Sequence, residues 1–246
     1  MVFFFLIAVF LTSIFPQMEK KKQAFEKSLL GAGVLDSVAK TITKDTRFGI
    51  DSLILKILKS RKKPDYNFLF TEESIARGKS FLHSYTPVKE AAKRFNIPAH
   101  IIVAVFRIES DFGLFLGNHN AANTYFTLFS VSKSNARKQY LIREFKKILE
   151  WCGERRINVF SVPTSWAGAV GLPQFMPSSF SLAVDGDNDG STDILSNFTD
   201  AVWSIANYLR ATNWNPKNQI GSLMRYNNSI LYAKNVLKYA QKILKK

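Results

Sequence analysis

The sequence predicts an all-α protein. Apolar residues recur at helical spacing over long stretches, most clearly in the segment from Thr71 to about Phe95. The segment 101–106 is apolar on every face, and it follows Pro98, a residue that suits the first turn of a helix, so we expect a helix that is buried on all sides. No segment shows a convincing alternation of apolar and polar residues, the pattern that predicts strands. The 246 residues are enough to bury a full core in one or two domains.

The chain begins with the apolar run 2–16 (VFFFLIAVFLTSIFP). The run is short for a transmembrane helix but has the length of the hydrophobic region of a secretory signal peptide. No Lys or Arg precedes it and no small-residue cleavage site follows it, so an uncleaved anchor is an alternative. A lipoprotein is excluded because no Cys follows the run. We therefore expect an exported protein with a signal sequence or an N-terminal membrane tether at residues 1–17.

Helical patterns continue through the rest of the chain. Residues 18–70 form an N-terminal helical segment, interrupted at Gly31 and Gly33 and at the basic break 61–64. Thr71 is a good N-cap for one long amphipathic helix that runs to about Phe95. Further helices are expected at about 98–109, 123–131, 135–151, 200–209 and 231–244, with one short helix that begins at Pro177 and another that follows residue 209. We expect residues 71–246 to form the main domain.

The charge balance favours a polyanionic partner. The chain has 34 Lys and Arg against 19 Asp and Glu, a formal net charge of +15. Nucleic acid, anionic lipid and the carboxylate-bearing bacterial cell wall all meet this description. The basic residues come in scattered pairs and triplets without a nucleic-acid motif, so we expect no nucleic-acid partner. The single cysteine, Cys152, cannot form an intrachain disulfide, and we expect it to be a packing residue.

Glu109 stands at the C-terminal end of the apolar helix, just before Gly113 allows the backbone to turn. Burial there disfavours the charged carboxylate and raises its pKa. A carboxyl group with a raised pKa can act as a general acid near neutral pH. The alternative is structural: Glu109 could pair with a nearby Arg or cap a neighbouring helix. Asp111 follows two residues later and points away on a helix, so we expect it to form structural hydrogen bonds and not to act as a second catalyst.

The segment 165–179 (SWAGAVGLPQFMPSS) combines small residues with one amide. Its Gly and Ala residues allow close approach of the backbone, and Gln174 offers both a donor and acceptors. This composition suits a tight wall that lines a polar groove. A contact between two helices that uses Gly and Ala for packing is the alternative.

An Asp-rich segment follows at 185–193 (DGDNDGSTD). Its carboxylates at positions one, three, five and nine, with Gly at position six, match the spacing of a calcium loop. The twelfth position is Ser196, which cannot supply the usual bidentate carboxylate, but Asp200 lies just beyond. We expect a structural calcium ion and no organic cofactor. The alternative is an acidic loop that only avoids regular secondary structure.

Four segments in one order resemble the lytic murein transglycosylases of the membrane-bound B type, a periplasmic family that cleaves the glycan strand of peptidoglycan. The segments are IPAHIIVAVFRIESDFG (97–113), SWAGAVGLPQFMPSSF (165–180), the Asp-rich loop leading into DAVWSIANYL (200–209), and RYNNSILYA (225–233). Weaker similarity reaches back to about residue 70, whereas residues 114–164 are only loosely similar. The resemblance implies an all-helical fold around a lysozyme-like core with additional N-terminal helices.

The resemblance also implies roles for individual residues. Glu109 matches the single catalytic acid, and the positions that match substrate contacts are Ser165, Gln174, Tyr226 and Asn227. The positions on or close to the calcium ligands are Asp185, Asp187, Asp189, Ser191 and Asp200. One extra residue between Asp193 and Asp200 is a departure from the family pattern, and it affects the assignment of Asp200 as the last calcium ligand.

The function implied is a peptidoglycan lytic transglycosylase of the bacterial periplasm or cell envelope. It would cleave the MurNAc-GlcNAc β-1,4 bond and leave a 1,6-anhydro-MurNAc end, with Glu109 as both acid and base. Two alternatives stay open: a lysozyme-type hydrolase that uses water as the nucleophile, and a non-catalytic protein that binds the cell wall. A binding protein would need the groove but not a desolvated acid.

Overall fold

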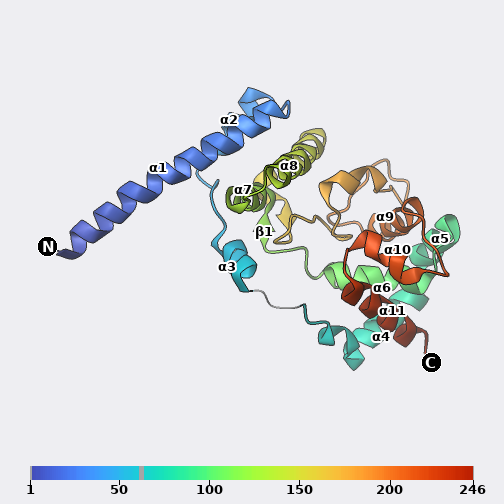
Figure 1. Cartoon of the computed structure of the whole chain (residues 1–246). Helices are drawn as coiled ribbons and strands as arrows, with labels where there is room; N and C mark the ends of the chain where they lie inside the picture. The colour runs from blue at the N-terminus through green and yellow to red at the C-terminus, as the bar shows by residue number, and fades with distance from the viewer. Residues whose placement is uncertain (1, 61–63, 246) are drawn as a thin grey trace. The chain divides into compact units, whose positions relative to one another are not determined.

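The computed structural model describes residues 2–60 and 64–245, with side chains from residue 16 onward (Figure 1). Each of its two compact units is formed by two separate stretches of chain. Unit 1 combines Met1–Ser60 with Asn118–Gly168, and unit 2 combines Arg61–Gly117 with Ala169–Lys246. The described chain is mainly helical, which confirms the predicted fold class.

Unit 1 is a group of helices packed around phenylalanine side chains. Its helices are α1 (Val2–Gly31), α2 (Asp36–Thr43), α3 (Ser52–Ser60), α7 (Ala121–Val131), α8 (Asn135–Arg155) and the 3-10 turn η2 (Val159–Ser161). Phe25 of α1 is fully buried, and four other rings lie within 5.8 Å of its ring, measured between centroids. These rings belong to Phe48, Phe126, Phe129 and Phe145. They join α1 to α7 and α8 through apolar burial.

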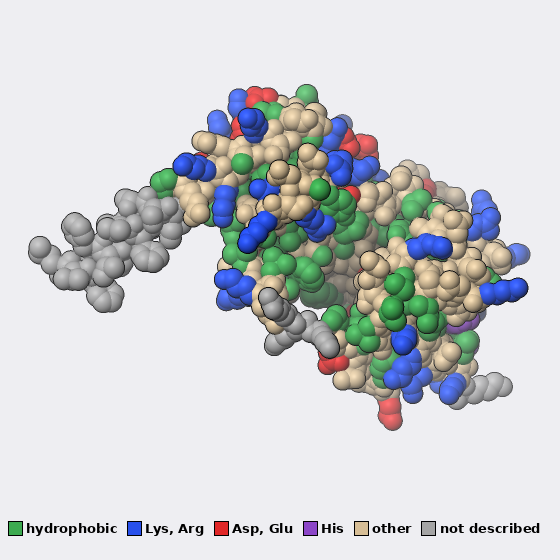
Figure 2. All heavy atoms as spheres, viewed as in Figure 1, with side chains coloured by type: hydrophobic (Ala, Val, Ile, Leu, Met, Phe, Trp, Pro, Cys, Tyr) green, Lys and Arg blue, Asp and Glu red, His purple; other side chains and the backbone are tan. Residues whose placement is uncertain are grey.

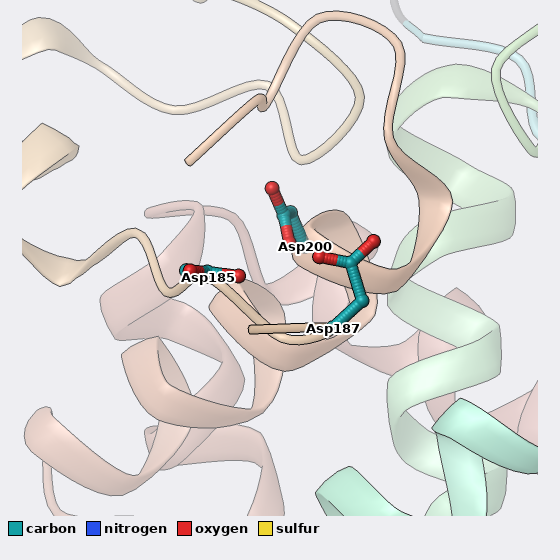
Figure 3. A group of neighbouring side chains, drawn as sticks. All are labelled: Asp185, Asp187 and Asp200. Atoms are coloured by element: carbon teal, nitrogen blue, oxygen red, sulfur yellow. The ribbon is translucent and has the colours of Figure 1, made fainter. Parts of the chain in front are cut away.

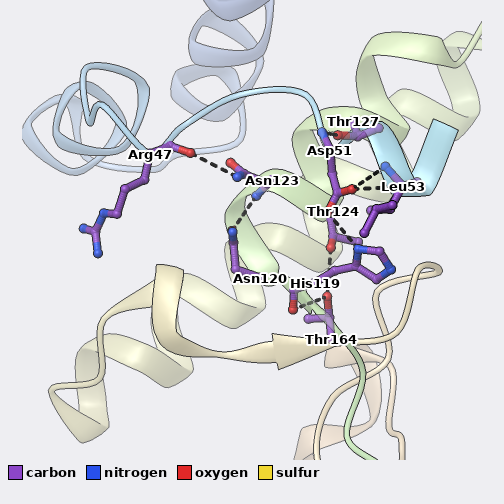
Figure 4. A network of polar contacts seen from close by, with 10 residues as sticks. Arg47, Asp51, Leu53, His119, Asn120, Asn123, Thr124, Thr127 and Thr164 are labelled. Atoms are coloured by element: carbon purple, nitrogen blue, oxygen red, sulfur yellow. Dashed lines mark hydrogen bonds and ion pairs between the residues drawn. The ribbon is translucent and has the colours of Figure 1, made fainter. Parts of the chain in front are cut away.

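Polar contacts fix the segment before α3 on α7 (Figure 4). His119 Nδ1 lies 2.7 Å from Asp51 Oδ2, and the Asp51 N–H donates to Thr127 Oγ1. The Asn123 side chain donates to the Arg47 carbonyl. His119 also belongs to β1 (His119–Asn120), which pairs antiparallel with β2 (Pro163–Thr164). These strands are two residues long, too short to produce a detectable alternation in the sequence.

Unit 2 is built around the apolar helix α6 (Ala99–Ser110). Ile101 to Phe106 are at most 1% exposed, because α4, α5, α9 and α11 pack around this helix. This confirms the prediction of a helix buried on all sides. The remaining elements of the unit are η1 (Asn67–Phe70), α4 (Glu72–Ser84), α5 (Thr86–Phe95), η3 (Pro177–Leu182), α9 (Phe198–Ala211), α10 (Gln219–Tyr226) and α11 (Ile230–Leu244).

The single long helix predicted from Thr71 to about Phe95 is wrong. The structure has two helices there, α4 and α5, separated by Tyr85 in an extended conformation. Pro87 explains the break, because proline has no N–H for the helical hydrogen bond and its ring clashes with the carbonyl one turn earlier. Thr71 caps the first helix as predicted, since its side chain accepts the Ser74 N–H.

The compact units differ from the domains expected from the sequence. Residues 118–168, expected within the domain 71–246, pack in unit 1 because α7 and α8 contact α1. Of the apolar run 2–16, only the side chain of Pro16 is among those described. Arg61, Lys62 and Lys63 of the basic break also lie outside the described residues. Within the part of the chain that was searched, no helix has the length and apolar character needed to span a membrane.

Candidate active site

Glu109 lies in the last turn of α6, where the backbone leaves the helix through a tight turn. Asp111 and Phe112 both adopt left-handed backbone conformations, with φ of 53° and 54°. Gly113 follows at φ 84°, and a Cβ at this position would lie 2.8 Å from Leu172 Cδ2. Glycine is therefore required both by the backbone conformation and by the close approach of Leu172.

The Glu109 carboxyl is enclosed by protein, although the residue as a whole keeps partial exposure to solvent. Burial raises its pKa from the ordinary 4.5 to about 8. The Tyr232 hydroxyl donates to Glu109 Oε1 at 2.5 Å, and this hydrogen bond acts in the opposite direction and lowers the pKa. At neutral pH the carboxyl group is therefore mostly protonated and has a donor ready to stabilise its ionised form.

The neighbouring carboxylate, Asp111, has a different environment. Its Oδ1 lies 2.9 Å from Arg77 Nη1 and 3.0 Å from Arg107 Nη1. Arg107 is buried and also donates to Ser74 Oγ. Asp111 is thus a structural group, as the sequence predicts. The alternative role for Glu109, pairing with an Arg, finds no support, because these two arginines pair with Asp111 and no ion pair involves Glu109 among the residues described.

Four tyrosines lie close enough to Glu109 for its charge to affect their pKa, and one of them, Tyr232, contacts its carboxyl. Burial raises the pKa of Tyr66, Tyr208, Tyr226 and Tyr232. The negative charge of ionised Glu109 also raises each of these pKa values. The rings of Tyr208 and Tyr226 stand 4.6 Å apart. Sequence reasoning identified Tyr226 alone. A buried Tyr hydroxyl usually has a hydrogen-bond partner, so the position of Tyr232 on a buried helix face suggests a partner but does not identify it as Glu109.

Gln174 lies in a turn that is closed by a bridge between Val170 and Phe175. Its Nε2 donates to the Gly171 carbonyl at 2.8 Å and to the Leu116 carbonyl at 3.4 Å. A Cβ at Gly171 would lie 2.4 Å from the backbone oxygen of Ile194. The small residue thus allows two loops to approach, and the alternative of a contact between two helices is wrong because the Gly and Ala residues of this segment, at 167–171, are not helical.

The other residues predicted to contact substrate have different surroundings. Tyr226 donates its hydroxyl to the Pro173 carbonyl at 2.7 Å, which ties α10 to the turn that carries Gln174. Asn227 is the exposed C-cap of α10. Ser165 belongs to unit 1, where its carbonyl accepts the Gly168 N–H. Contacts of Ser165, Gln174, Tyr226 and Asn227 with a substrate stay predictions.

The Asp-rich loop brings three carboxylates together (Figure 3). One oxygen each from Asp185, Asp187 and Asp200 lies within 4.8 Å of the others. Asp200 comes from the first turn of α9, so it takes the place that Ser196 cannot fill. Asp189 is not one of the three; its carboxylate accepts the Ser191 N–H, and Ser191 is exposed.

Asp200 is fully buried and accepts the N–H groups of Gly186 and Asp193. Burial raises its pKa, and the charges of Asp187 and Asp185 raise it further. A divalent cation would relieve this repulsion, and carboxylate oxygens are the ligands that calcium prefers. The donor set therefore fits a calcium ion.

Comparisons with known proteins identify the family to which this chain belongs. Residues 17–223 match a family described as Transglycosylase SLT domain. The chain is 29% identical over 166 residues to the membrane-bound lytic murein transglycosylase B of Escherichia coli, a match that covers 66% of this chain and 44% of that protein. This chain thus spans less than half the length of that relative.

Two solved structures show that the fold is that of the helical lytic transglycosylases. One is the Escherichia coli lytic transglycosylase SLT35 in complex with calcium, with 19% identity, a TM-score of 0.75, and coverage of 91% of this chain and 92% of that one. The other is SltB3 from Pseudomonas aeruginosa in complex with NAG-anhNAM-pentapeptide, with 20% identity, a TM-score of 0.75, and coverage of 90% and 78%. The resemblance found in the sequence is confirmed at the level of fold and family.

Proposed function

Because this chain belongs to the Transglycosylase SLT domain family, we propose that it is a peptidoglycan lytic transglycosylase. It cleaves the MurNAc-GlcNAc β-1,4 bond and leaves a 1,6-anhydro-MurNAc end. The observation that carries this proposal is the state of Glu109: an enclosed carboxyl group with a pKa of about 8, next to a carboxylate neutralised by two arginines. One acid is available for proton transfer, and Asp111 is not.

In the first step, protonated Glu109 donates its proton to the glycosidic oxygen as the bond from that oxygen to C1 of MurNAc breaks. The leaving sugar departs with a new hydroxyl group. Glu109 becomes a carboxylate, and the hydroxyl of Tyr232 stabilises the new charge through the hydrogen bond already in place. Because the donor is positioned in advance, the charge develops without reorganisation of the site.

In the second step, the Glu109 carboxylate removes the proton from the 6-hydroxyl of the same MurNAc residue. The 6-oxygen then closes on C1, so the bond lost to the leaving oxygen is replaced within the sugar. Glu109 ends protonated, as it began, and no water is consumed. Glycosidases usually need a second carboxylate as nucleophile or base. An internal nucleophile removes that need, which agrees with the structural role of Asp111.

Four polar residues are assigned to substrate binding. Gln174 and Tyr226 are supported by their common attachment to the turn 170–175, and Tyr226 also by the effect of the Glu109 charge, which raises its pKa. Ser165 and Asn227 are assigned from their place in the segments that resemble the family. The partner is the peptidoglycan strand; SltB3, which shares the fold, is known in complex with a NAG-anhNAM-pentapeptide.

A structural calcium ion is the second part of the proposal. Asp185, Asp187 and Asp200 hold it, with Asp189 and Ser191 in the same loop as the weaker assignments. SLT35 forms a complex with calcium, which supports the assignment. The ion fixes the loop that precedes α9 and takes no part in proton transfer. We place the enzyme in the bacterial cell envelope, where its substrate is found, and residues 1–17 as its export signal or tether.

Glu109→Gln tests the proposal. The amide keeps the shape of the side chain but cannot give up and recover a proton, so turnover of purified sacculi should fall on the order of a hundredfold or more. Binding to sacculi and the circular dichroism spectrum should stay at parent values. If the variant retains activity within a fewfold of the parent, Glu109 is not the acid. A Glu144→Gln variant is a matched control because Glu144 is also a buried glutamate, in unit 1.

A further inference from the structure

Unit 1 contains a groove that the proposed chemistry does not use. It has a volume of about 510 Å³ and is lined by the C-terminal end of α1, one residue of α7 and the first half of α8. Binding sites for small ligands have volumes of roughly 300–1,000 Å³. The groove is therefore large enough for a short peptide or a comparable group.

Cations stand at this groove without acidic partners. Lys138 and Arg143 of α8 contribute to its lining, and the lining contains no Asp or Glu within the described part of the chain. Of the other cations of α8, Lys146 pairs with Glu150 and Arg155 with Glu154, whereas no ion pair among the described residues involves Arg137 or Lys147. No ion pair within the described ranges involves Lys138 or Arg143. The groove thus offers positive charge to an anion from outside.

The groove also has an apolar side. Phe129 and Ile142 line it and are 5% and 3% exposed. The ammonium group of Lys138 lies 5.3 Å from the centroid of the Phe129 ring, which places this charge directly over the apolar surface. Gly31 leaves open space, since a Cβ there would meet nothing within 4 Å. A ligand with small apolar groups beside a carboxylate would suit both parts of the lining.

The distribution of charge between the units agrees with an anionic partner. Unit 1 carries 17 Lys and Arg and 8 Asp and Glu, a formal net charge of +9 of the total of +15. Figure 2 shows Lys and Arg side chains scattered among apolar and uncharged groups over the visible face. The unit without Glu109 therefore has the larger net charge, +9 against +6, and a long-range field of this sign attracts anionic polymers.

We propose that the groove between α1 and α8 binds the peptide stems of peptidoglycan, through their carboxylates at Lys138 and Arg143 and their alanine methyl groups at Phe129 and Ile142. The inference rests on the proposed function, which makes the cell wall the partner. Stems recur along the glycan strand, so a weak site of this kind increases retention on the polymer by raising the effective concentration of the next stem. Unit 1 is then a wall-binding module as well as a support.

Charge reversal in the groove tests the proposal. Lys138→Glu with Arg143→Glu is compared with Lys56→Glu and Lys59→Glu, two exposed cations on α3 of the same unit. Both pairs change the net charge equally, so the comparison isolates the location of the charge. All variants carry Glu109→Gln to prevent cleavage. Each is incubated with intact sacculi, with glycan strands freed of their stems by an amidase, and with anionic phospholipid vesicles.

The groove variant should bind intact sacculi at least fivefold more weakly than the α3 variant, and the two should bind stem-free glycan equally. Equal binding to intact sacculi would overturn the proposal, as would a difference that persists on stem-free glycan. A difference seen only with vesicles would assign the groove to lipid headgroups instead. Failure of the proposed function is separate, because it would appear as the absence of anhydro product from the parent enzyme on stem-free strands.

Discussion

At the scale of single residues, the site depends on two opposing effects at Glu109. Burial favours the protonated carboxyl, whereas the hydrogen bond from Tyr232 favours the carboxylate. The first makes Glu109 an acid near neutral pH, and the second limits the cost of the charge that forms during bond cleavage. Asp111, two residues away, is instead paired with Arg77 and Arg107.

The pH dependence of kcat/KM should report this balance. Glu109 must be protonated for the first step, so kcat/KM should be level below a pH of about 8 and fall above it. Tyr232→Phe removes the hydrogen bond that lowers the pKa, so the alkaline limb should move to higher pH. Tyr239→Phe is the control, since Tyr239 also lies in α11 but donates to the Ser74 carbonyl. An alkaline limb that moves down, or moves equally in both variants, contradicts the assignment.

The raised pKa of Glu109 should also make folding stability depend on pH. The native state keeps the Glu109 proton up to a pH of about 8, whereas the unfolded chain loses it near 4.5. The native state therefore loses stability relative to the unfolded state as pH rises through this interval. Glu109→Gln removes this pH dependence. The free energy of unfolding of the variant, relative to that of the parent, should therefore increase by about a few kcal/mol between pH 4.5 and pH 8. Urea titrations of both proteins at several pH values measure the gain, and a difference independent of pH would show that Glu109 is not desolvated.

How well the sequence predicted the site depends on the range of the interactions involved. Glu109 could be identified because six buried residues precede it along one helix. Tyr232 could not, because its contact joins α6 to α11 and no local pattern encodes that pairing. The break at Tyr85 has another cause. The helical periodicity of α4 continues into α5, so apolar spacing does not reveal the break, and Pro87 alone indicates it.

At the scale of elements, the Asp-rich loop shows how a motif is completed from outside itself. The spacing from Asp185 to Asp193 predicted an ion, but the third carboxylate of the group is Asp200, supplied by α9. Asp189, at the fifth position of the motif, accepts a backbone N–H from its own loop. A pattern of spacing identifies the loop, and the fold selects which of its carboxylates converge.

Calcium should stabilise the protein without changing its chemistry. Binding to the native state alone contributes about 2.7 kcal/mol at a hundredfold excess over Kd, enough to raise the melting temperature by about 5 °C or more. Asp185→Asn with Asp187→Asn should abolish this rise, whereas Asp189→Asn should retain most of it. Melting curves in calcium and in chelator provide the comparison. Identical curves for the parent protein would exclude the site.

At the scale of the whole molecule, each unit is formed by two separate stretches of the chain, and local sequence patterns do not reveal such an arrangement. Residues 118–168 carry ordinary helical periodicity, and their membership of unit 1 depends on long-range packing of α7 and α8 on α1. The fold class and the family were predictable because buried helices and the four segments are local features. The division into units was not, since it is decided by contacts between residues far apart in sequence.

The central claim is that the substrate supplies the nucleophile, with Glu109 as the only acid and base. Digestion of purified peptidoglycan in water enriched in heavy oxygen, followed by mass spectrometry of the fragments, tests it most directly. The account predicts MurNAc ends that are lighter than hydrolysed ends by one water and carry no heavy oxygen. Fragments of full mass with heavy oxygen at C1 would show that water is the nucleophile, and the protein would then be a lysozyme-type hydrolase.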